Sequence, residues 1–472
     1  MDYLDDGAGM TAYLDFVASK GRFDLPTGLV SETLNGPLFP FQRDVTKWAL
    51  KRGRAAIFAG TGLGKTLMQL SWADAIRREI GGKVLILTPL AVAQQTVSEA
   101  RKFGIFGAKY HQDGRTISPI TVTNYDRIEK FDLGEFVAIV LDESSIIKSH
   151  NGKTRALLTE LTREIKYKLC CTATPAPNDY VELGQHAEFL GVMLAKEMLS
   201  TWFVHDGSNR ATNVKNKGKP VANWRLKGHA EKDFWRWVAS WAMLVRKPSD
   251  LGYDDDAYAL PPLVKRQITV PVEYSRNGML FDMAANTLSE RLQARKKSIL
   301  QRCAAAAELV NAHPDQQWLV WCHLNAEEEA ITALIPGAIP VRGSDDRELK
   351  AERLLGFADG DVRILCSKPS LAGFGMNFQG CHNMVFCGLN DSFEQLYQAI
   401  RRCWRFGQKH QVNVFMIASE LEGAVVKNLE EKEAAFDRMS DALAAQVREY
   451  QDPKPRRIHS ASNHKGSVPA WL

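Results

Sequence analysis

Short apolar runs alternate with amphipathic stretches through the first part of the chain. Short, largely apolar runs predict five β-strands, at residues 55–59, 84–88, 120–123, 136–141 and 167–172, and some of them, such as 137–141, are apolar throughout. Such runs are typical of parallel strands that are covered by helices on both faces. Between the first two runs, residues 66–79 keep a helical period and stop before Gly81 and Gly82, which predicts a helix that ends there. The pattern as a whole indicates an α/β sheet.

The pattern changes after about residue 195 and then resumes. Residues 196–250 hold five tryptophans and no obvious parallel strand; Trp237 and Trp241 share a helix face, so we interpret the tryptophans as core residues. A second alternating series covers residues 318–322, 339–342, 363–366, 384–386 and 412–417, with helical patterns at 346–357 and 393–404. We therefore expect an N-terminal helical segment (1–35), a first α/β lobe (36–195), a tryptophan-rich and basic linker (196–259), a second α/β lobe (260–450) and a basic, disordered tail (451–472).

Composition narrows the class of protein. The chain has 472 residues, 45% hydrophobic and 24% charged, which excludes a wholly disordered chain, a fibre and a coiled coil. No apolar run approaches the roughly 20 residues that cross a bilayer, and the acidic first ten residues do not resemble a secretory signal, so a cytoplasmic protein without a membrane partner is expected. Eight cysteines without a C-x-x-C pair favour reduced thiols, with neither a zinc knuckle nor a disulfide framework.

Charge is a weaker guide than composition. The net charge of +5 only hints at nucleic acid, but basic residues are dense between Arg210 and Lys227, where Lys215, Lys217 and Lys219 alternate with polar residues. A solvated loop and a loop that follows phosphates both fit this stretch. The two interpretations stay open at this point.

The clearest chemical signal is the octapeptide AGTGLGKT at residues 59–66, between a predicted strand and a predicted helix. Small residues let successive backbone N–H groups point at phosphate oxygens, and the helix adds its positive N-terminal end. Lys65 would neutralise the β- and γ-phosphates, and the Thr66 hydroxyl would coordinate magnesium. The segment predicts a site for ATP and Mg²⁺.

A second signal is the pair of acids that follows the apolar run 136–141. Acids at the end of a buried parallel strand lie at the carboxyl edge of the sheet, beside the phosphate loop. Asp142 would hold the hydrated magnesium ion, and Glu143 would orient and deprotonate the attacking water. Together the two signals predict a nucleotide hydrolase.

The order of the motifs resembles the superfamily 2 helicases, and specifically their Swi/Snf-type translocase branch. In the first half the resemblance rests on Pro40-Phe41-Gln42, the loop 59–66, Thr88-Pro89, Thr123-Asn124-Tyr125, the acidic box from Asp142 to Lys148, and Thr172-Ala173-Thr174-Pro175. In the second half it rests on Leu260-Pro261-Pro262, Val320-Trp321-Cys322-His323, Val341-Arg342-Gly343, the segment 372–377, and the closing segment QAIRRCWRFGQ at 398–408. The resemblance covers about residues 39–430 and implies two tandem RecA-like lobes with ATP in the cleft between them.

The resemblance also implies roles for individual residues. ATP would be bound by Gln42, which reads the adenine edge, and by Gly60, Thr61, Gly62, Leu63, Gly64, Lys65, Thr66 and Gly375. Catalysis would use Glu143, Gln398 and two arginine fingers, Arg402 and Arg405, and lobe movement would be coupled through Thr172, Thr174 and Ser145. Nucleic acid would be contacted by Thr88, Tyr125, His323, Ser367 and Trp404, and, if the basic stretch follows phosphates, also by Lys215, Lys217 and Lys219.

Two departures from the family pattern matter. Ser144-Ser145 stands where the family usually has Ala-His, so the contact of that histidine must be remade by a hydroxyl or lost. The stretch between the lobes is short for the branch, which favours a compact bacterial or phage motor. We expect a monomeric ATPase that moves along double-stranded DNA. The alternatives are a strand-separating DNA or RNA helicase and an ATP-gated binding module without processive movement.

Overall fold

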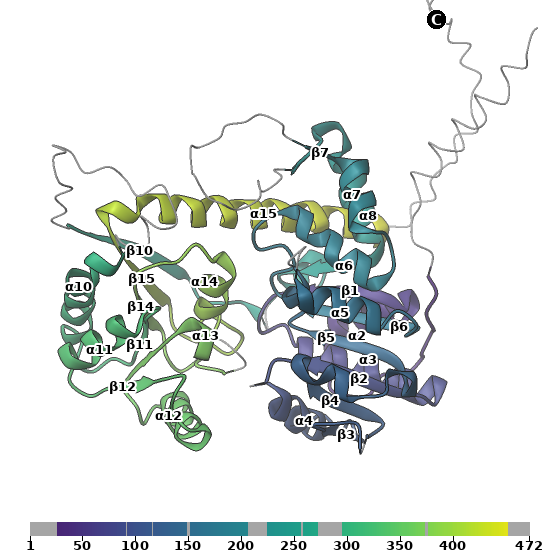
Figure 1. Cartoon of the computed structure of the whole chain (residues 1–472), viewed down its shortest axis with the longest axis horizontal. Helices are drawn as coiled ribbons and strands as arrows, with labels where there is room; N and C mark the ends of the chain where they lie inside the picture. Colours follow the sequence, from purple (N-terminus) through teal and green to yellow (C-terminus); the bar gives the residue numbers. More distant parts are fainter. Residues whose placement is uncertain are drawn as a thin grey trace, which may run out of the picture.

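A computed structural model describes residues 26–451, except 91, 116, 149–151, 206–223, 256–257, 272–294 and 373–375. Figure 1 shows two α/β lobes side by side, with one long helix lying across both. None of the helices in these described ranges is both long and apolar enough to span a membrane.

The first lobe is built on a parallel sheet of seven strands in the order β3-β4-β2-β5-β6-β1-β9. Its strands are β1 (Arg54–Ala59), β2 (Lys83–Thr88), β3 (Ala108–Tyr110), β4 (Ile120–Asn124), β5 (Phe136–Asp142), β6 (Tyr167–Thr172) and β9 (Ala242–Val245). Its helices are α2 (Pro40–Arg52), α3 (Lys65–Ile80), α4 (Ala93–Lys102), α5 (Lys153–Leu161), α6 (Leu183–Leu190), α7 (Ala195–Trp202) and α8 (Glu231–Trp241). The five strands predicted from apolar runs are confirmed to within one residue at each end.

The second lobe is a parallel sheet of six strands in the order β10-β15-β14-β11-β13-β12. Its strands are β10 (Leu263–Val270), β11 (Trp318–Trp321), β12 (Ala338–Val341), β13 (Ile364–Ser367), β14 (Asn383–Cys387) and β15 (Val412–Ser419). Its helices are α10 (Ile299–Asn311), α11 (Asn325–Leu334), α12 (Arg347–Asp359), α13 (Pro369–Ala372) and α14 (Phe393–Ile400). Two tandem RecA-like lobes are thereby confirmed.

The tryptophan-rich stretch needs a correction, because it belongs partly to the first lobe. β9 pairs in parallel with β1, so residues 242–245 complete the first sheet, although no strand was expected there. The sequence pattern did not predict this strand, because its four apolar residues directly follow the helix α8, whose own apolar residues extend to its last position. The tryptophans themselves are core residues: Trp235, Trp237 and Trp241 are buried, and Trp237 stacks on Trp202 with ring centroids 4.6 Å apart. At the other end, residues 26–35 contain no helix, and the remainder of the expected N-terminal helical segment lies outside the described residues.

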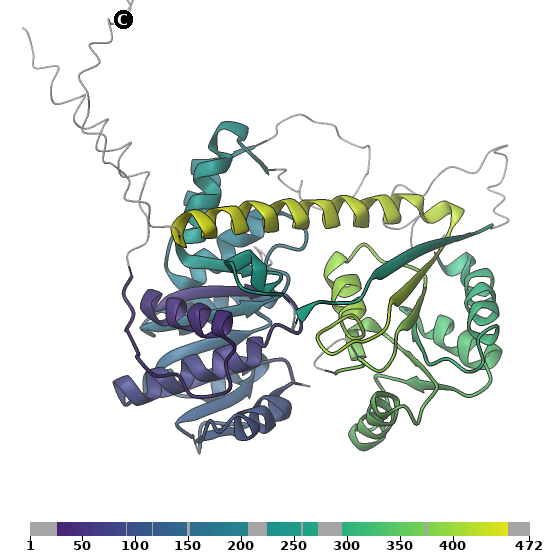
Figure 2. The same cartoon turned by 180° about the vertical axis from the view of Figure 1, so that it is seen from behind.

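The helix α15 (Gly423–Gln451) was assigned to the second lobe, but it lies across both lobes in the two opposite views of Figures 1 and 2. The hydroxyl of Tyr180, in lobe 1, donates to the carbonyl of Ala435 at 2.9 Å. In lobe 2, Phe393 of α14 packs against Phe436 with ring centroids 5.6 Å apart. A single buried hydrophobic cluster runs through both lobes and α15. The two sheets are therefore held together by shared apolar packing, and the proposed tail after residue 451 lies outside the described residues.

Candidate nucleotide site between the lobes

The phosphate loop has the predicted strand–loop–helix setting. β1 ends at Ala59, and α3 begins at Lys65 directly after Gly64, whose φ of 79° is left-handed. The ammonium of Lys65 donates to the carbonyl of Ala59 at 3.0 Å, which folds the side chain back along the loop. A Cβ at Gly64 would lie 2.3 Å from Nε2 of Gln42. The loop thus depends on glycine for both its backbone conformation and its close contact with α2.

Gln42 is buried and has its amide bonded within the protein. Its Oε1 accepts from the backbone N–H of Phe39 at 3.0 Å, and its Nε2 donates to the carbonyl of Leu63 at 2.9 Å and to the hydroxyl of Tyr258 at 3.2 Å. These contacts tie α2 to the phosphate loop. The adenine contact remains a prediction, and it requires the amide to exchange one of these partners for the base.

The two acids lie where β5 ends. Asp142 is the last residue of the strand and is buried, and the hydroxyl of Tyr125 donates to its backbone carbonyl at 2.6 Å. Glu143 has a φ of 54°, and among the described residues it is the only non-glycine residue with a positive φ. Backbone conformations of this kind cost free energy and persist where the surroundings impose them, often at functional sites.

Electrostatics at the acids favour a bound cation. Burial raises the pKa of the Asp142 carboxyl above its usual range, the neighbouring Glu143 raises it further, and Lys65 lowers it. A divalent cation would relieve the repulsion between two adjacent carboxylates, and oxygen ligands suit magnesium. The residues present therefore fit Mg²⁺, with Thr66 and Asp142 as the side chains that would hold it.

Residues of both lobes line one cavity, which contains the phosphate loop and the two acids. Its volume is about 570 Å³, and its walls include Thr61, Gly62, Gly64, Lys65, Thr66, Asp142 and Glu143 from lobe 1 and Gln398, Arg402, Arg405 and Phe406 from lobe 2. Residues more than 300 positions apart in the sequence thus meet around one space. An interlobe ligand would be contacted by both sheets.

Arg402 and Arg405 are held only loosely by the protein. Arg402 is 7% exposed, and Nη1 of each arginine donates to the carbonyl of Met376, at 3.3 and 3.4 Å respectively. Burial lowers the pKa of Arg402 to about 10 and also lowers the pKa of Arg405. Within the described part of the chain neither forms an ion pair, so an anion in the cavity would supply the missing counter-charge.

The helix that precedes these arginines is shorter than predicted. α14 ends at Ile400 instead of Trp404, and the following residues form turns that lead back toward β15. The backbone N–H of Phe378 donates to the carbonyl of Arg402 at 3.0 Å, which takes the chain out of the helical path. The arginines therefore enter the cavity from a loop and not from one helix face.

Three aromatic side chains of the cavity were not singled out from the sequence. The rings of Phe39 and Tyr258 are 5.3 Å apart, and those of Tyr258 and Phe406 are 5.0 Å apart. Tyr258 lies in the acidic turn before β10, where nothing in the sequence marks a ligand site. The three rings supply an apolar wall from lobe 1, the linker and lobe 2.

Comparison with known proteins identifies the family. The DEAD/DEAH box helicase family matches residues 39–183, which include the phosphate loop and the acidic pair. The helicase conserved C-terminal domain matches residues 301–407, which include Gln398 and both arginines. The chain belongs to the superfamily 2 helicases.

Individual relatives are distant. The human and bovine proteins named DNA annealing helicase and endonuclease ZRANB3 are each 22% identical over 430 residues, which is 82% of this chain and 39% of the relative. The Bacillus subtilis (strain 168) protein named uncharacterized ATP-dependent helicase YqhH is 21% identical over 468 residues, 87% of this chain and 82% of the relative. Together with the motif order, these relatives place the helicase in the Swi/Snf-type branch.

Among solved structures, the Sulfolobus solfataricus SWI2/SNF2 ATPase core in complex with dsDNA is 18% identical to this helicase. The match covers 89% of this chain and 97% of that chain, with a TM-score of 0.40. The fold assignment of the helicase rests on the two sheets described above.

A histidine from elsewhere in the fold lies against the acidic box. Oγ of Ser144 lies 3.1 Å from Nε2 of His186, which belongs to α6, and both residues are fully buried. Burial lowers the pKa of His186 to about 4, so the imidazole is neutral. A hydroxyl therefore makes a contact with a histidine through Ser144, which stands at the alanine position of the family pattern, whereas Ser145, at the histidine position, is buried.

The predicted coupling threonines of the helicase do connect motifs. Oγ1 of Thr172 donates to Oε2 of Glu143 at 3.4 Å, and the backbone N–H of Thr174 donates to Oγ1 of Thr172 at 3.2 Å. Oγ1 of Thr174 then donates to Glu394 of lobe 2 at 3.3 Å. Their position agrees with a coupling role, which remains a prediction.

Three of the predicted nucleic-acid contacts need correction, because their side chains are buried. Thr88 and Ser367 are fully buried, and their hydroxyls donate to the carbonyls of Pro89 at 2.8 Å and Val341 at 3.2 Å. The hydroxyl of Tyr125 is used to hold Asp142. These polar side chains satisfy the backbone inside the lobes, which leaves them no atom for a phosphate.

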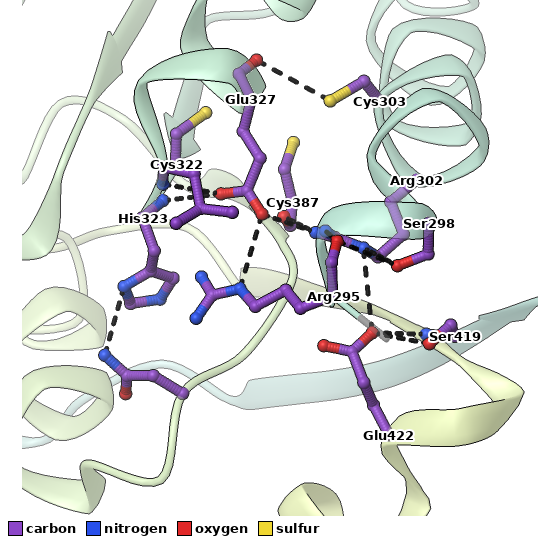
Figure 3. Close-up of polar contacts among 12 residues, drawn as sticks. Arg295, Ser298, Arg302, Cys303, Cys322, His323, Glu327, Cys387, Ser419 and Glu422 are labelled. Atoms are coloured by element: carbon purple, nitrogen blue, oxygen red, sulfur yellow. Dashed lines mark hydrogen bonds and ion pairs between the residues drawn. The ribbon is translucent and has the colours of Figure 1, made fainter. Parts of the chain in front are cut away.

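His323 also lies in an internal network, which Figure 3 shows. Oε2 of Glu327 accepts from the backbone N–H groups of His323 and Leu324 at 2.8 and 3.0 Å, and Oε1 of Glu327 accepts from the fully buried Arg302 at 2.8 Å. Burial lowers the pKa of His323 to about 3, and its Nδ1 lies 3.1 Å from the Asn390 amide. A neutral imidazole in this network organises lobe 2 and carries no charge for a phosphate.

Trp404 is hydrogen-bonded to the first residues of lobe 2. Its indole N–H donates to the carbonyl of Pro261 at 2.7 Å, and the guanidinium of Arg401 lies 4.2 Å from the centre of its ring. The side chain thus joins the closing motif to the entrance of lobe 2, and its contact with DNA remains a prediction. The remaining predicted contacts, Lys215, Lys217 and Lys219, and the ATP-site residue Gly375 lie outside the described residues.

Proposed function

We propose that this helicase is a monomeric motor that hydrolyses ATP between its lobes and thereby translocates along double-stranded DNA. The observation that carries the proposal is the shared cavity, with a phosphate loop and two acids on one wall and two arginines on the other. ATP placed there would be bound by both lobes at once.

Each wall has its own part in the hydrolysis. Lys65 would neutralise the phosphates, Thr66 and Asp142 would hold Mg²⁺, and Glu143 would accept the proton of the attacking water. Arg405 and Arg402 would stabilise the charge that develops on the departing γ-phosphate, a role that accounts for a factor of about 10³–10⁵ in related enzymes. Bound Mg²⁺ supplies charge neutralisation across the phosphates.

Movement of the lobes would follow because both of them bind the same triphosphate. The triphosphate draws the two lobes together, and loss of the γ-phosphate releases the arginines. Repeated closure would shift the contacts of the two lobes along a nucleic-acid backbone. Such contacts go mainly to phosphates, so the binding should tolerate any sequence and weaken with salt.

Duplex DNA is the proposed track for several reasons. The closing motif resembles the branch that follows duplex DNA, and the related Sulfolobus core is described as a complex with dsDNA. The basic stretch of sequence between Arg210 and Lys227 would supply contacts, in keeping with its charge. ZRANB3 is named a DNA annealing helicase, so DNA is favoured over RNA.

The test is the steady-state ATPase rate with duplex DNA, single-stranded DNA or RNA, measured over a series of lengths. We expect stimulation by duplex DNA that grows with duplex length, because a translocating enzyme spends less time rebinding on a longer track. Saturation on short duplexes would indicate a gated binding module, and stimulation by RNA alone would exclude a DNA motor. Lys65→Ala serves as the inactive control, because it removes the side chain that would neutralise the phosphates of ATP.

A further inference from the structure

Glu394 joins the two lobes beside the nucleotide cavity. It lies in the first turn of α14, and its carboxylate forms an ion pair with Lys148, the lysine that follows the acidic box of lobe 1. The other oxygen of the carboxylate accepts from Oγ1 of Thr174 at 3.3 Å. The Glu394 side chain is 13% exposed, so these contacts are largely shielded from water. One carboxylate of lobe 2 therefore binds two separate motifs of lobe 1.

Both motifs lead directly to Glu143, the proposed catalytic base. Thr174 is bonded through its N–H to Thr172, whose hydroxyl donates to Oε2 of Glu143 at 3.4 Å. Lys148 is separated from Glu143 by a single 3₁₀ turn, Ser144–Ile147, and its backbone N–H donates to the carbonyl of Ser145 at 3.1 Å. A continuous set of hydrogen bonds thus runs from the base to α14.

On the other side, Glu394 is linked to the residues that lobe 2 contributes to the cavity. Gln398 lies four positions further along α14, on the same face of the helix, and lines the cavity. The chain continues from α14 into the turns that carry Arg402 and Arg405, and the N–H of Arg402 donates to the carbonyl of Ala399 at 3.2 Å. A shift of α14 would therefore move Gln398, Arg402 and Arg405 together.

We infer that Glu394 is a positioning residue that fixes α14 against the acidic box and the Thr172–Thr174 segment, so that the two arginines face the phosphates. The inference rests on the proposed function and adds to it the contact through which hydrolysis in lobe 1 is linked to the placement of lobe 2. Without the contact, ATP still binds to lobe 1, but the arginines are no longer held in the reactive arrangement. The loss should appear in kcat and not in the KM for ATP.

The surroundings of the pair guide the choice of variants. Burial raises the pKa of the Glu182 carboxyl most strongly. The charge of Lys148 lowers this pKa and the charge of Glu394 raises it, so Glu182 lies near both residues of the ion pair. Neutral substitutions avoid a new repulsion with Glu182. Glu394→Gln keeps the shape of the side chain, and Lys148→Met keeps the length of the lysine stem.

The experiment compares kcat and KM for ATP in the wild type, the two single variants and the double variant, with and without duplex DNA. We expect each single variant to lower kcat about tenfold or more with KM within about twofold, and the double variant to be no slower than the slower single variant. Asp441→Asn is the matched control, because it removes another contact between lobe 1 and α15, the pair between Arg246 and Asp441 at 2.6 Å. It should keep the wild-type kcat.

A wild-type kcat in Glu394→Gln, or losses that add in the double variant, would overturn the inference. So would an equal loss in Asp441→Asn, which would indicate a general loosening of the lobes. If Glu394→Gln does not fold, as judged by thermal unfolding, Thr174→Val removes the second contact of the carboxylate and must itself lower kcat. A wild type without DNA stimulation would refute the proposed function instead, and the basal kcat of the same variants would then decide the role of Glu394.

Discussion

The two walls of the nucleotide cavity differ in how firmly the protein holds their functional groups. On the lobe 1 wall, Lys65, Gln42 and the backbone of Asp142 each have a partner in the protein at 2.6–3.0 Å. On the lobe 2 wall, Arg402 and Arg405 share one carbonyl at 3.3 and 3.4 Å. The groups of the first wall are fixed by the protein before a ligand arrives, whereas the two arginines of the second wall form no ion pair among the described residues and face a cavity that an anion could enter. Changes on the second wall should therefore affect turnover more than affinity.

The largest effect is expected for Arg405→Ala. Its charge matters most as the γ-phosphate departs, so DNA-stimulated turnover should fall by about 10³–10⁵-fold while ATP affinity stays nearly unchanged. Arg405→Lys should rescue poorly, because a point charge lacks the planar fork of the guanidinium. Nucleotide binding and turnover in the same variant provide the check.

The control for this variant is Arg401→Ala, which removes a neighbouring arginine that stacks on Trp404 outside the cavity. It should retain most of the DNA-stimulated rate. Full stimulation in Arg405→Ala would show that lobe 2 does not complete the site.

On the first wall, Glu143→Gln separates chemistry from binding. The amide keeps the shape of the side chain but cannot accept the proton of water, so hydrolysis should slow by about 10²–10⁴-fold with ATP and DNA binding retained. Single-turnover hydrolysis and equilibrium binding measure the two quantities separately. A loss smaller than about fivefold would assign the base to another residue.

A pH effect of intermediate size should arise from Asp142. Because its pKa is raised in the folded chain, protons compete with Mg²⁺ as the pH falls through that raised value, and the apparent Mg²⁺ affinity should fall with it. Raising the Mg²⁺ concentration should restore the rate on the acidic side. A rate profile that does not respond to Mg²⁺ would contradict this assignment.

The same raised pKa has a consequence for stability without Mg²⁺. The folded chain binds the Asp142 proton more tightly than the unfolded chain does, so the carboxylate destabilises the fold increasingly as pH rises above the unfolded pKa. Asp142→Asn should therefore raise the melting temperature near pH 8 and not near pH 3. Thermal unfolding at the two pH values measures the difference, and an equal shift at both would contradict it.

The smallest effect is expected for Gln42→Ala. The variant removes the amide that is predicted to contact the adenine edge, and a hydrogen bond of this kind contributes about 1 kcal/mol, so ATP affinity should fall by up to roughly tenfold while kcat changes little. Gln411→Ala, which removes an exposed amide bonded to Asn413 at 3.0 Å, is the matched control. A fall in kcat larger than the fall in affinity would mean that the contrast between the two walls is wrong.

The sequence by itself determined the features that are encoded within single elements. Apolar runs predicted ten strands of the two sheets, because a strand buried on both faces must be apolar along its length. The phosphate loop and the two acids were located from local spacing, since a loop between strand and helix can be read from neighbouring residues. The signal failed where an element was short, as in β9, or where the chain left the helix early, as after Ile400.

Only the tertiary structure decided which side chains meet across elements. The sequence could not show that His186 would lie in hydrogen-bond contact with Ser144, that α15 would lie across both lobes, or that Glu394 would pair with Lys148. It assigned Thr88, Tyr125 and Ser367 to DNA, although burial gives their hydroxyls to the backbone. The physical reason is that periodicity reports which face of an element is buried, whereas the partner on that face depends on how separate elements pack.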